Sequence, residues 1–176
     1  MEKVKMCSFI GHRDVNATPE LKMLLKEKIV KLIKREGVRY FLFGSASKFD
    51  ELCLQTVTEL KKQYPEIVRV YVRAKERYLT EERKKSLLKI YDDTIMPPDM
   101  ENAGRASYVK RNQAMIDAST YCIFYCNPQY SLSMKQKLGY SVKRLKSGTQ
   151  IAFDYANRKA CNGKELTIIN LYIELH

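Results

Sequence analysis

Short apolar runs alternate with longer amphipathic segments along the first 72 residues of the chain. The apolar runs cover residues 4–10, 38–43 and 67–72, and nearly continuous runs of this kind are typical of strands buried on both faces of a sheet. Between them, residues 18–37 repeat leucine and isoleucine at helical spacing, and a second helical pattern begins near Phe49 and stops before a proline. This order predicts a β-α-β-α-β unit, in which helical crossovers join parallel strands with right-handed connections.

The boundaries of the first helix are marked by residues that favour helix ends. Thr18 is a good N-cap and Pro19 suits the first helical position, whereas Gly37 is typical of the position just after a helix. Lysines occupy many of the positions between the apolar side chains, so this helix is predicted to expose a basic face.

The rest of the chain is less regular, but it contains the same kinds of element. A charged helix is expected over residues 80–91, with Leu87, Leu88 and Tyr91 on its apolar side. The basic segment 131–146 fits either a mobile loop or an irregular helix. The other predicted elements are a short strand at 94–96, a helix at 106–118, a strand at 121–125, a helix from 147 to about 160, a strand at 166–170 and a tail at 171–176. Together they predict a single α/β domain over residues 1–176, with a doubly wound, mostly parallel sheet, helices on both faces, and a strand order that reverses near the first strand.

The charge of the chain narrows the range of partners. The 176 residues include 32 Lys and Arg against 20 Asp and Glu, for a formal net charge of +12, and such a balance favours nucleotides, nucleic acid or acidic surfaces. Many of the lysines fall on the polar faces of predicted helices, where they are simply solvated. We therefore expect nucleic-acid binding to be weak and non-specific at most.

Other features of the composition bear on location and chemistry. No apolar run reaches 18 residues, so no membrane span is expected, and the first residues lack the apolar core of a signal peptide, which favours the cytoplasm. The five cysteines show no C-x-x-C spacing and fit reduced, mostly buried thiols, and two histidines are too few for a zinc constellation. We therefore expect neither a metal nor a cofactor, while the oligomeric state stays open, a homo-oligomer included.

Small and polar residues occur where a parallel sheet would bring them to one edge. They are Gly11, His12 and Arg13 after the first strand, Gly44, Ser45 and Ala46 after the second, with Asp50 near the next helix start, and Ser147, Gly148 and Thr149 at the start of a later helix. Helix N-termini supply unpaired N–H groups that suit phosphate, and Arg13 and Arg111 can each add paired hydrogen bonds to it. The spacing matches neither a Walker loop nor the G-x-G-x-x-G fingerprint, so it predicts a phosphate site without specifying the ligand.

The order of four short motifs is more specific. The motifs are Gly11-His12-Arg13, Gly44-Ser45-Ala46 with Phe49-Asp50, Tyr108-x-x-Arg111-Asn112-x-x-Met115-x-Asp117, and Ser147-Gly148-Thr149. In this order they resemble the YpsA-like branch of the SLOG superfamily, which also contains the Lonely Guy phosphoribohydrolases and the DprA/Smf DNA-processing proteins. The resemblance extends from about residue 3 to residue 170. It implies a Rossmann-like fold and a site for a nucleotide or a nucleotide-derived molecule at the strand ends.

The resemblance also implies roles for single residues. It places Arg111 and Asn112 among the polar groups of the site, on the same helix as Tyr108. His12 fits either a contact to a ligand phosphate or ribose, or a structural bond to a neighbouring loop. Asp50 fits either a helix cap or a contact to a ribose hydroxyl.

Three functions remain open at this point. Lonely Guy enzymes carry a glutamate shortly after their Gly-Thr pair, whereas here Gln150 follows and the first acid is Asp154. N-glycosidic hydrolysis needs acidic groups near the ribose, so we expect a module that binds or senses a nucleotide-derived ligand rather than an enzyme, and we assign no catalytic residue. The alternatives are a nucleoside monophosphate phosphoribohydrolase, with Asp50, Asp117 and Asp154 as its candidate acids, and a DprA-like nucleic-acid binder that uses the basic residues of 135–146.

Overall fold

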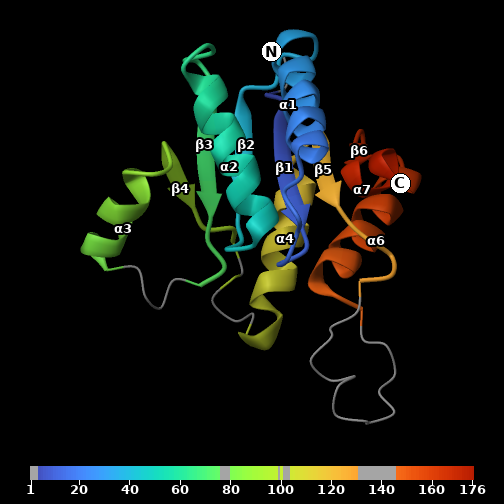
Figure 1. Cartoon of the computed structure of the whole chain (residues 1–176). Helices are drawn as coiled ribbons and strands as arrows, with labels where there is room; N and C mark the ends of the chain where they lie inside the picture. Colours follow the sequence, from blue (N-terminus) through green and yellow to red (C-terminus); the bar gives the residue numbers. More distant parts are fainter. Residues whose placement is uncertain (1–3, 76–79, 99, 101–103, 131–145) are drawn as a thin grey trace.

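Six strands form one sheet in the computed structural model, which describes residues 4–75, 80–98, 100, 104–130 and 146–176 (Figure 1). The strands are β1 (Met6–Gly11), β2 (Tyr40–Phe43), β3 (Val68–Val72), β4 (Asp93–Ile95), β5 (Tyr121–Tyr125) and β6 (Thr167–Asn170). They lie in the order β4-β3-β2-β1-β5-β6, and every neighbouring pair is parallel. The parallel sheet predicted from the apolar runs is confirmed.

The strand order reverses beside β1. From β1 the chain builds β2, β3 and β4 outward on one side, and it then returns to add β5 and β6 on the other side. The register places Gly11 at the end of β1 opposite Tyr125 at the end of β5. The reversal expected near the first strand is confirmed, and ligands of open α/β sheets bind at such a switch point, outside the carboxyl ends of the strands.

Helices cover both faces of the sheet (Figure 1). One face carries α1 (Pro19–Lys34), α2 (Lys48–Lys61) and α7 (Leu171–Leu175), and the other carries α4 (Ser107–Ala118) and α6 (Gly148–Cys161). A short α3 (Glu81–Leu88) lies beside β4, and a single 3-10 turn, η1 (Gly104–Ala106), precedes α4. Because side chains alternate along a strand, β1 sends Phe9 into the core under α1 and α2, and Ile10 into the core under α4 and α6.

Hydroxyl side chains begin four of the helices. Thr18 Oγ1 accepts a hydrogen bond from the Leu21 N–H at 3.3 Å, which confirms the predicted N-cap of α1. Ser47, Thr80 and Ser147 cap α2, α3 and α6 in the same way. The caps of α2 and α6 place the starts of both helices at the carboxyl edge of the sheet.

Two local predictions are wrong. The expected tail at 171–176 contains the helix α7, because the Asn170 side chain caps it and Leu171 is fully buried in the core. Leu88 does not lie on a buried face: it is 44% exposed, since α3 stands at the edge of the sheet and buries none of its own residues. Tyr91, just after α3, is buried as expected. The ambiguous basic segment falls, over 131–145, outside the described residues.

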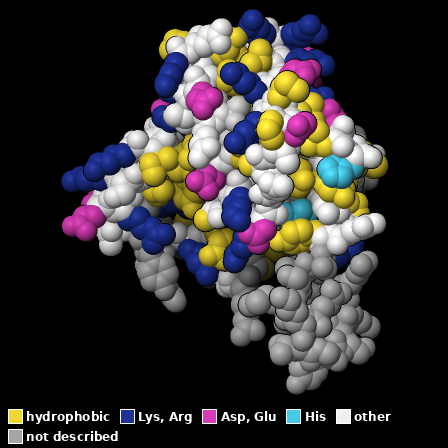
Figure 2. Space-filling model, viewed as in Figure 1, with side chains coloured by type: hydrophobic (Ala, Val, Ile, Leu, Met, Phe, Trp, Pro, Cys, Tyr) yellow, Lys and Arg dark blue, Asp and Glu magenta, His cyan; other side chains and the backbone are white. Residues whose placement is uncertain are grey.

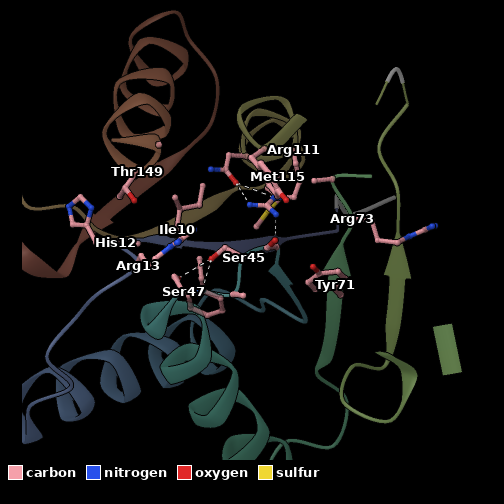
Figure 3. Close-up of a pocket in the computed structure, with 18 of the residues that line it drawn as sticks. Ile10, His12, Arg13, Ser45, Ser47, Tyr71, Arg73, Arg111, Met115 and Thr149 are labelled. Carbon is pink, nitrogen blue, oxygen red and sulfur yellow. Dashed lines mark hydrogen bonds between the residues drawn. The ribbon is translucent and has the colours of Figure 1, made fainter. Parts of the chain in front are cut away.

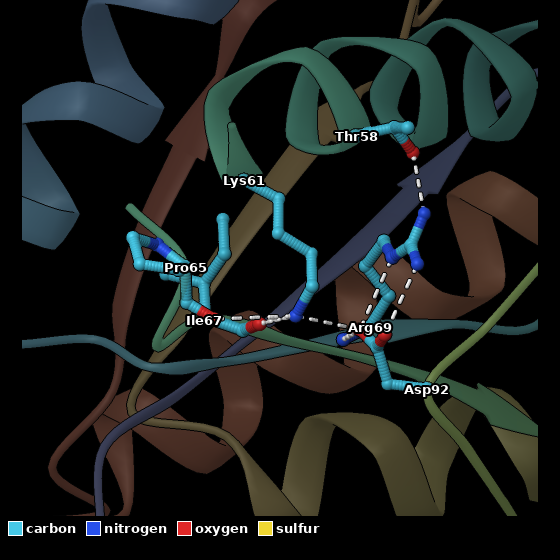
Figure 4. Close-up of polar contacts among 6 residues, drawn as sticks. All are labelled: Thr58, Lys61, Pro65, Ile67, Arg69 and Asp92. Carbon is cyan, nitrogen blue, oxygen red and sulfur yellow. Dashed lines mark hydrogen bonds and ion pairs between the residues drawn. The ribbon is translucent and has the colours of Figure 1, made fainter. Parts of the chain in front are cut away.

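A polar cluster joins α2, β3 and β4 at the amino edge of the sheet, opposite the switch point (Figure 4). The Arg69 guanidinium donates from Nε and Nη2 to both carboxylate oxygens of Asp92, at 3.1 and 3.0 Å, and its Nη1 donates to Thr58. Lys61 Nζ lies 3.3 Å from the same carboxylate. Although its partial burial opposes ionisation, these donors lower the pKa of Asp92 to about 2. The cluster ties the edge strand β4 to β3 and α2 and lies away from the carboxyl edge.

Charged side chains are spread over the surface. Figure 2 shows lysine and arginine scattered over the viewed face, with acidic and apolar side chains between them. Within the described ranges, none of the helices combines the length and the apolar character that crossing a membrane requires.

Candidate functional site

A cavity of about 1060 Å³ opens at the carboxyl ends of β1, β2 and β3 (Figure 3). Its wall also includes the starts of α2, α4 and α6. The structure brings together these residues of the predicted site: Gly11, His12, Arg13, Gly44, Ser45, Ala46, Tyr108, Arg111, Asn112, Gly148 and Thr149. Asp50 is the exception and does not line the cavity.

His12 is buried in the wall of this cavity, with 1% of its surface exposed. Its Nε2 accepts a hydrogen bond from the Asn127 N–H at 2.9 Å, and its ring stacks on Tyr130 with the ring centroids 3.8 Å apart. Burial lowers the pKa of His12 to about 4, so the imidazole is neutral near pH 7. Because Nε2 is an acceptor, the proton lies on Nδ1, and among the described residues this donor has no partner. His12 thus combines a structural bond at Nε2 with a buried Nδ1 donor that lacks a partner among the described residues.

The start of α6 contributes backbone N–H groups to the same side of the cavity. Ser147 Oγ accepts a hydrogen bond from the Gln150 N–H at 3.1 Å, and the N–H groups of Gly148 and Thr149, the first donors of the helix, have no partner within the described part of the chain. A Cβ added to Gly148 would meet no atom within 4 Å. Figure 3 places Thr149, His12 and Arg13 together at one end of the labelled group.

At the ends of β1 and β2, glycine is required because neighbouring side chains leave no room for a Cβ. A Cβ on Gly11 would lie 2.6 Å from the Phe49 Cβ and closer still to its ring. A Cβ on Gly44 would lie 2.7 Å from Arg111 Nε and 2.8 Å from Met115 Sδ. The packing of neighbouring side chains therefore explains both glycines, whereas of the three glycines that line the cavity Gly148 alone has free space beside it.

Arg111 is buried behind the loop that follows β2. It is 4% exposed, its Nη1 donates to the carbonyl oxygen of Gly44, and its Nη2 donates to Asn112 Oδ1 at 3.0 Å. Its guanidinium also lies 5.5 Å from the centre of the Tyr108 ring. Arg111 therefore lines the cavity, but one of its N–H groups is already bonded to the Gly44 carbonyl and holds that loop in position.

Asp50 supports the same loop from the other side. Its carboxylate accepts a hydrogen bond from the Ser45 N–H at 2.9 Å, and the capping role that sequence reasoning considered for it belongs to Ser47. Burial raises the pKa of Asp50 to about 7, although the Ser45 N–H and the Arg111 charge oppose this shift. Asp50 is thus a buried group that supports the loop behind the wall without lining the cavity.

The cavity is rich in cations. The arginines and lysines that line it are Arg13, Arg73, Lys75, Arg83 and Arg111, and among the described lining residues the one acid is Asp14, whose carboxylate pairs with Lys48 at 3.3 Å. The other candidate acids lie elsewhere: Asp117 contacts Tyr155 and Lys159, and Asp154 contacts Lys146 and Gln150. The described residues contain no group of three histidine, cysteine or acidic side chains placed to hold a metal ion. The excess of cations over acids in the wall suits an anionic ligand.

Sequence reasoning missed several lining residues. Tyr71, Arg73 and Lys75 lie in or just after β3, so applying the strand-end argument to the third strand would have indicated their part of the wall. Arg83 on α3 and Tyr130 after β5 carry no comparable signal, since only tertiary packing brings them to the cavity.

Comparison with known proteins gives a family and two similar structures. A family model described as the YspA SLOG family (YpsA) matches residues 5–157, whereas no curated protein matches the chain. The chain is similar to DNA processing protein A (DprA) from Streptococcus pneumoniae, with 11% identity and a TM-score of 0.45, over 99% of this chain but only 62% of that one. It is also similar to the molybdenum cofactor carrier protein from Chlamydomonas reinhardtii, with 13% identity and a TM-score of 0.45, over 96% of this chain and 91% of that one. Since the family match extends over most of its length, the chain belongs to the YspA SLOG family.

Proposed function

We propose that this chain binds a phosphate-bearing, nucleotide-derived ligand at the carboxyl ends of its strands and acts as a binding or sensing module. The observation that carries the proposal is His12 in the cavity wall, whose Nδ1–H is buried and has no acceptor among the described residues. An unsatisfied buried donor costs about 1–3 kcal/mol, and a phosphate oxygen that reached Nδ1 after a small shift of the ring would recover much of this cost.

The surroundings of His12 support the same ligand chemistry. The Gly148 and Thr149 N–H groups begin a 14-residue helix, whose dipole favours negative charge at its N-terminus. Arg13 is exposed and adds a mobile cation that can close on a bound phosphate. A neutral imidazole donor, two backbone N–H groups and an arginine form a complete set of partners for one phosphate.

The acidic residues that the structure describes favour binding over hydrolysis. None of Asp50, Asp117 and Asp154 lines the cavity, and Asp14, which does, is engaged with Lys48. Cleavage of an N-glycosidic bond needs a carboxylate near the ribose. We therefore expect the ligand to leave the site chemically unchanged.

Calorimetry with the purified chain and a Gly148→Ala variant tests this proposal, using AMP, GMP, NAD and ADP-ribose as ligands. The added methyl group projects into open space, so it should leave folding intact while it blocks the approach of a phosphate to the helix start. We expect the wild type to bind at least one of these ligands and the variant to bind it at least tenfold more weakly. Urea denaturation of both proteins should show the same or slightly higher stability for the variant.

A second variant tests the charge. Losing one charge-assisted hydrogen bond costs about 1.5–3 kcal/mol, so Arg13→Gln should weaken binding about ten- to a hundredfold. Arg35→Gln removes an equally exposed arginine that does not line the cavity, and it should bind like the wild type. Binding that survives both Gly148→Ala and Arg13→Gln would refute the proposed phosphate site. Release of free base or ribose 5-phosphate, detected by chromatography, would show that the chain is a hydrolase rather than a binding module.

A further inference from the structure

The cavity continues beyond the proposed phosphate site to the end of β3. Three more cations line this part of its wall: Arg73 and Lys75 directly after β3, and Arg83 on α3. Figure 3 places Arg73 at the opposite side of the labelled group from His12 and Thr149. The cavity therefore has two cationic ends, which we call the α6 end (His12, Arg13, Gly148 and Thr149) and the β3 end (Arg73, Lys75 and Arg83).

The charges of the β3 end are not neutralised by the described part of the chain. No carboxylate of the described residues forms an ion pair with Arg73, Lys75 or Arg83. The Nε and Nη1 atoms of Arg73 are buried and have no hydrogen-bond partner there either. Like charges gathered in a hollow raise the local potential, and an anion that binds among them relieves their repulsion.

The sheet sets the separation of the two ends. The strands β1 and β3 flank β2, and neighbouring strands lie about 4.8 Å apart, so their carboxyl ends are about 10 Å apart. One phosphate group cannot reach both. A ligand that satisfies both ends needs two anionic groups in different parts of the molecule.

Tyr108 stands between the β3 end and Arg111 and offers an aromatic surface. Its ring centre lies 5.3 Å from Lys75 Nζ, near the β3 end, and 5.5 Å from the guanidinium carbon of Arg111, which contacts the β2 loop. Tyr108 is 57% exposed although it lines the cavity. An exposed tyrosine ring in a cationic cavity is a suitable platform for a nucleobase.

We infer that the ligand is a nucleotide that carries phosphate at two separate positions, one bound at the α6 end and the other at the β3 end. This inference rests on the proposed function, because it takes the first phosphate site from it. It adds the class of ligand, which is a nucleoside bisphosphate or a dinucleotide with a further phosphate on a ribose. Such a ligand binds more tightly than the same molecule without the second phosphate.

Calorimetry with three matched ligand pairs tests the inference. The pairs are AMP and adenosine 3′,5′-bisphosphate, GMP and guanosine 3′,5′-bisphosphate, and NAD and NADP, whose members differ by one phosphate. In the wild type the additional phosphate should tighten binding about ten- to a hundredfold in at least one pair. In the Lys75→Gln/Arg83→Gln variant this gain should disappear, so that the two members of the pair bind with the same affinity.

A matched variant separates a local site from general attraction by the positive charge. Lys84→Gln/Lys85→Gln removes two exposed cations from α3 that do not line the cavity, so it should keep the full gain from the second phosphate. If the Lys84/Lys85 variant loses the gain as well, or if the two members of every pair bind equally, the second phosphate site is refuted while the first stands. If none of the six ligands binds, the proposed function fails together with the inference.

A single-stranded hexanucleotide provides the last comparison. Tighter binding of this oligonucleotide than of every bisphosphate, lost in the Lys75→Gln/Arg83→Gln variant, would assign the two cationic ends to successive phosphates of a nucleic acid. That outcome would overturn the small-molecule class inferred above.

Discussion

Phe49 occupies the space that a side chain at residue 11 would need, because a Cβ on Gly11 would lie 2.6 Å from the Phe49 Cβ and closer still to the ring. Phe49 is fully buried in the first turn of α2, and Gly11 ends β1. This contact holds the start of α2 against the end of the central strand. It therefore sets where the loop between β2 and α2 stands in the wall of the cavity.

Gly11→Ala should destabilise the fold. The extra methyl group forces the Phe49 ring out of its position, and overpacking of this kind costs about 1–3 kcal/mol of unfolding free energy. Urea denaturation measures the effect, and Gly148→Ala is the matched control, since its methyl group meets no atom within 4 Å. In a Gly11→Ala/Phe49→Leu double variant, the loss of unfolding free energy should be smaller than the sum of the losses in the two single variants. The reason is that the smaller leucine side chain makes room for the methyl group. Equal stability of Gly11→Ala and the wild type would contradict the role given to Phe49.

Arg111→Met should also lower stability, because Arg111 is a structural support as well as a wall residue. The substitution keeps the volume but removes the donors to Gly44 and Asn112, and hydrogen bonds of a charged group contribute about 1.5–3 kcal/mol. The exposed Arg13, changed to Met in the same way, should alter the unfolding free energy by no more than about 0.5 kcal/mol. A denaturation midpoint for Arg111→Met at the wild-type value would mean that the bond to Gly44 contributes nothing to folding.

Because of the titration of Asp50, the free energy of unfolding should fall as the pH rises from about 4 to 7. Burial raises the pKa of Asp50 to about 7, whereas in the unfolded chain it lies near the ordinary value of 3.8. Between these values the unfolded chain has released the proton that the folded chain still holds, so stability falls as pH increases and the loss is complete above pH 7. Asp50→Asn keeps an acceptor for the Ser45 N–H and removes the titration. The difference in unfolding free energy between wild type and variant, measured at several pH values, should therefore change across this window and stay constant above it.

His12 should titrate far below an ordinary histidine. Burial lowers its pKa from 6.5 to about 4, so the stability that depends on its neutral form is complete above pH 6.5 and is lost as the pH falls towards 4. The chain has two histidines, and a His12→Gln variant assigns their NMR signals. We expect the His12 signals to keep their neutral shifts down to about pH 5. A bound nucleoside monophosphate should raise the pKa of His12, since a nearby anion favours the imidazolium. A midpoint near 6.5 in the free protein would contradict the burial of the ring.

Much of the fold and the position of the site follow from local patterns. The apolar runs, the Thr18 cap and the small residues after two strands predict parallel strands whose carboxyl ends share one edge, and the structure places Gly11, Gly44 and Gly148 in one cavity there. These predictions succeed because apolar periodicity reports burial, and because a parallel sheet aligns its strand ends whatever the details of packing. Whether the gathered residues bind a nucleotide is a proposal, which the variants above test.

The structural role of individual residues, in contrast, depends on contacts that only the tertiary structure shows. The sequence by itself determined that glycines end β1 and β2, but it could not show that Phe49, Arg111 and Met115 fill the space beside them. Asp50 was a candidate site residue because it stands near a helix start in the Phe49-Asp50 motif, yet its carboxylate accepts a hydrogen bond from the loop backbone and does not line the cavity. Arg83 reached the wall from a helix with no site signal of its own. The physical reason is that sequence patterns report which face of an element is buried, whereas the direction of a side chain and its partners depend on contacts between segments far apart in the chain.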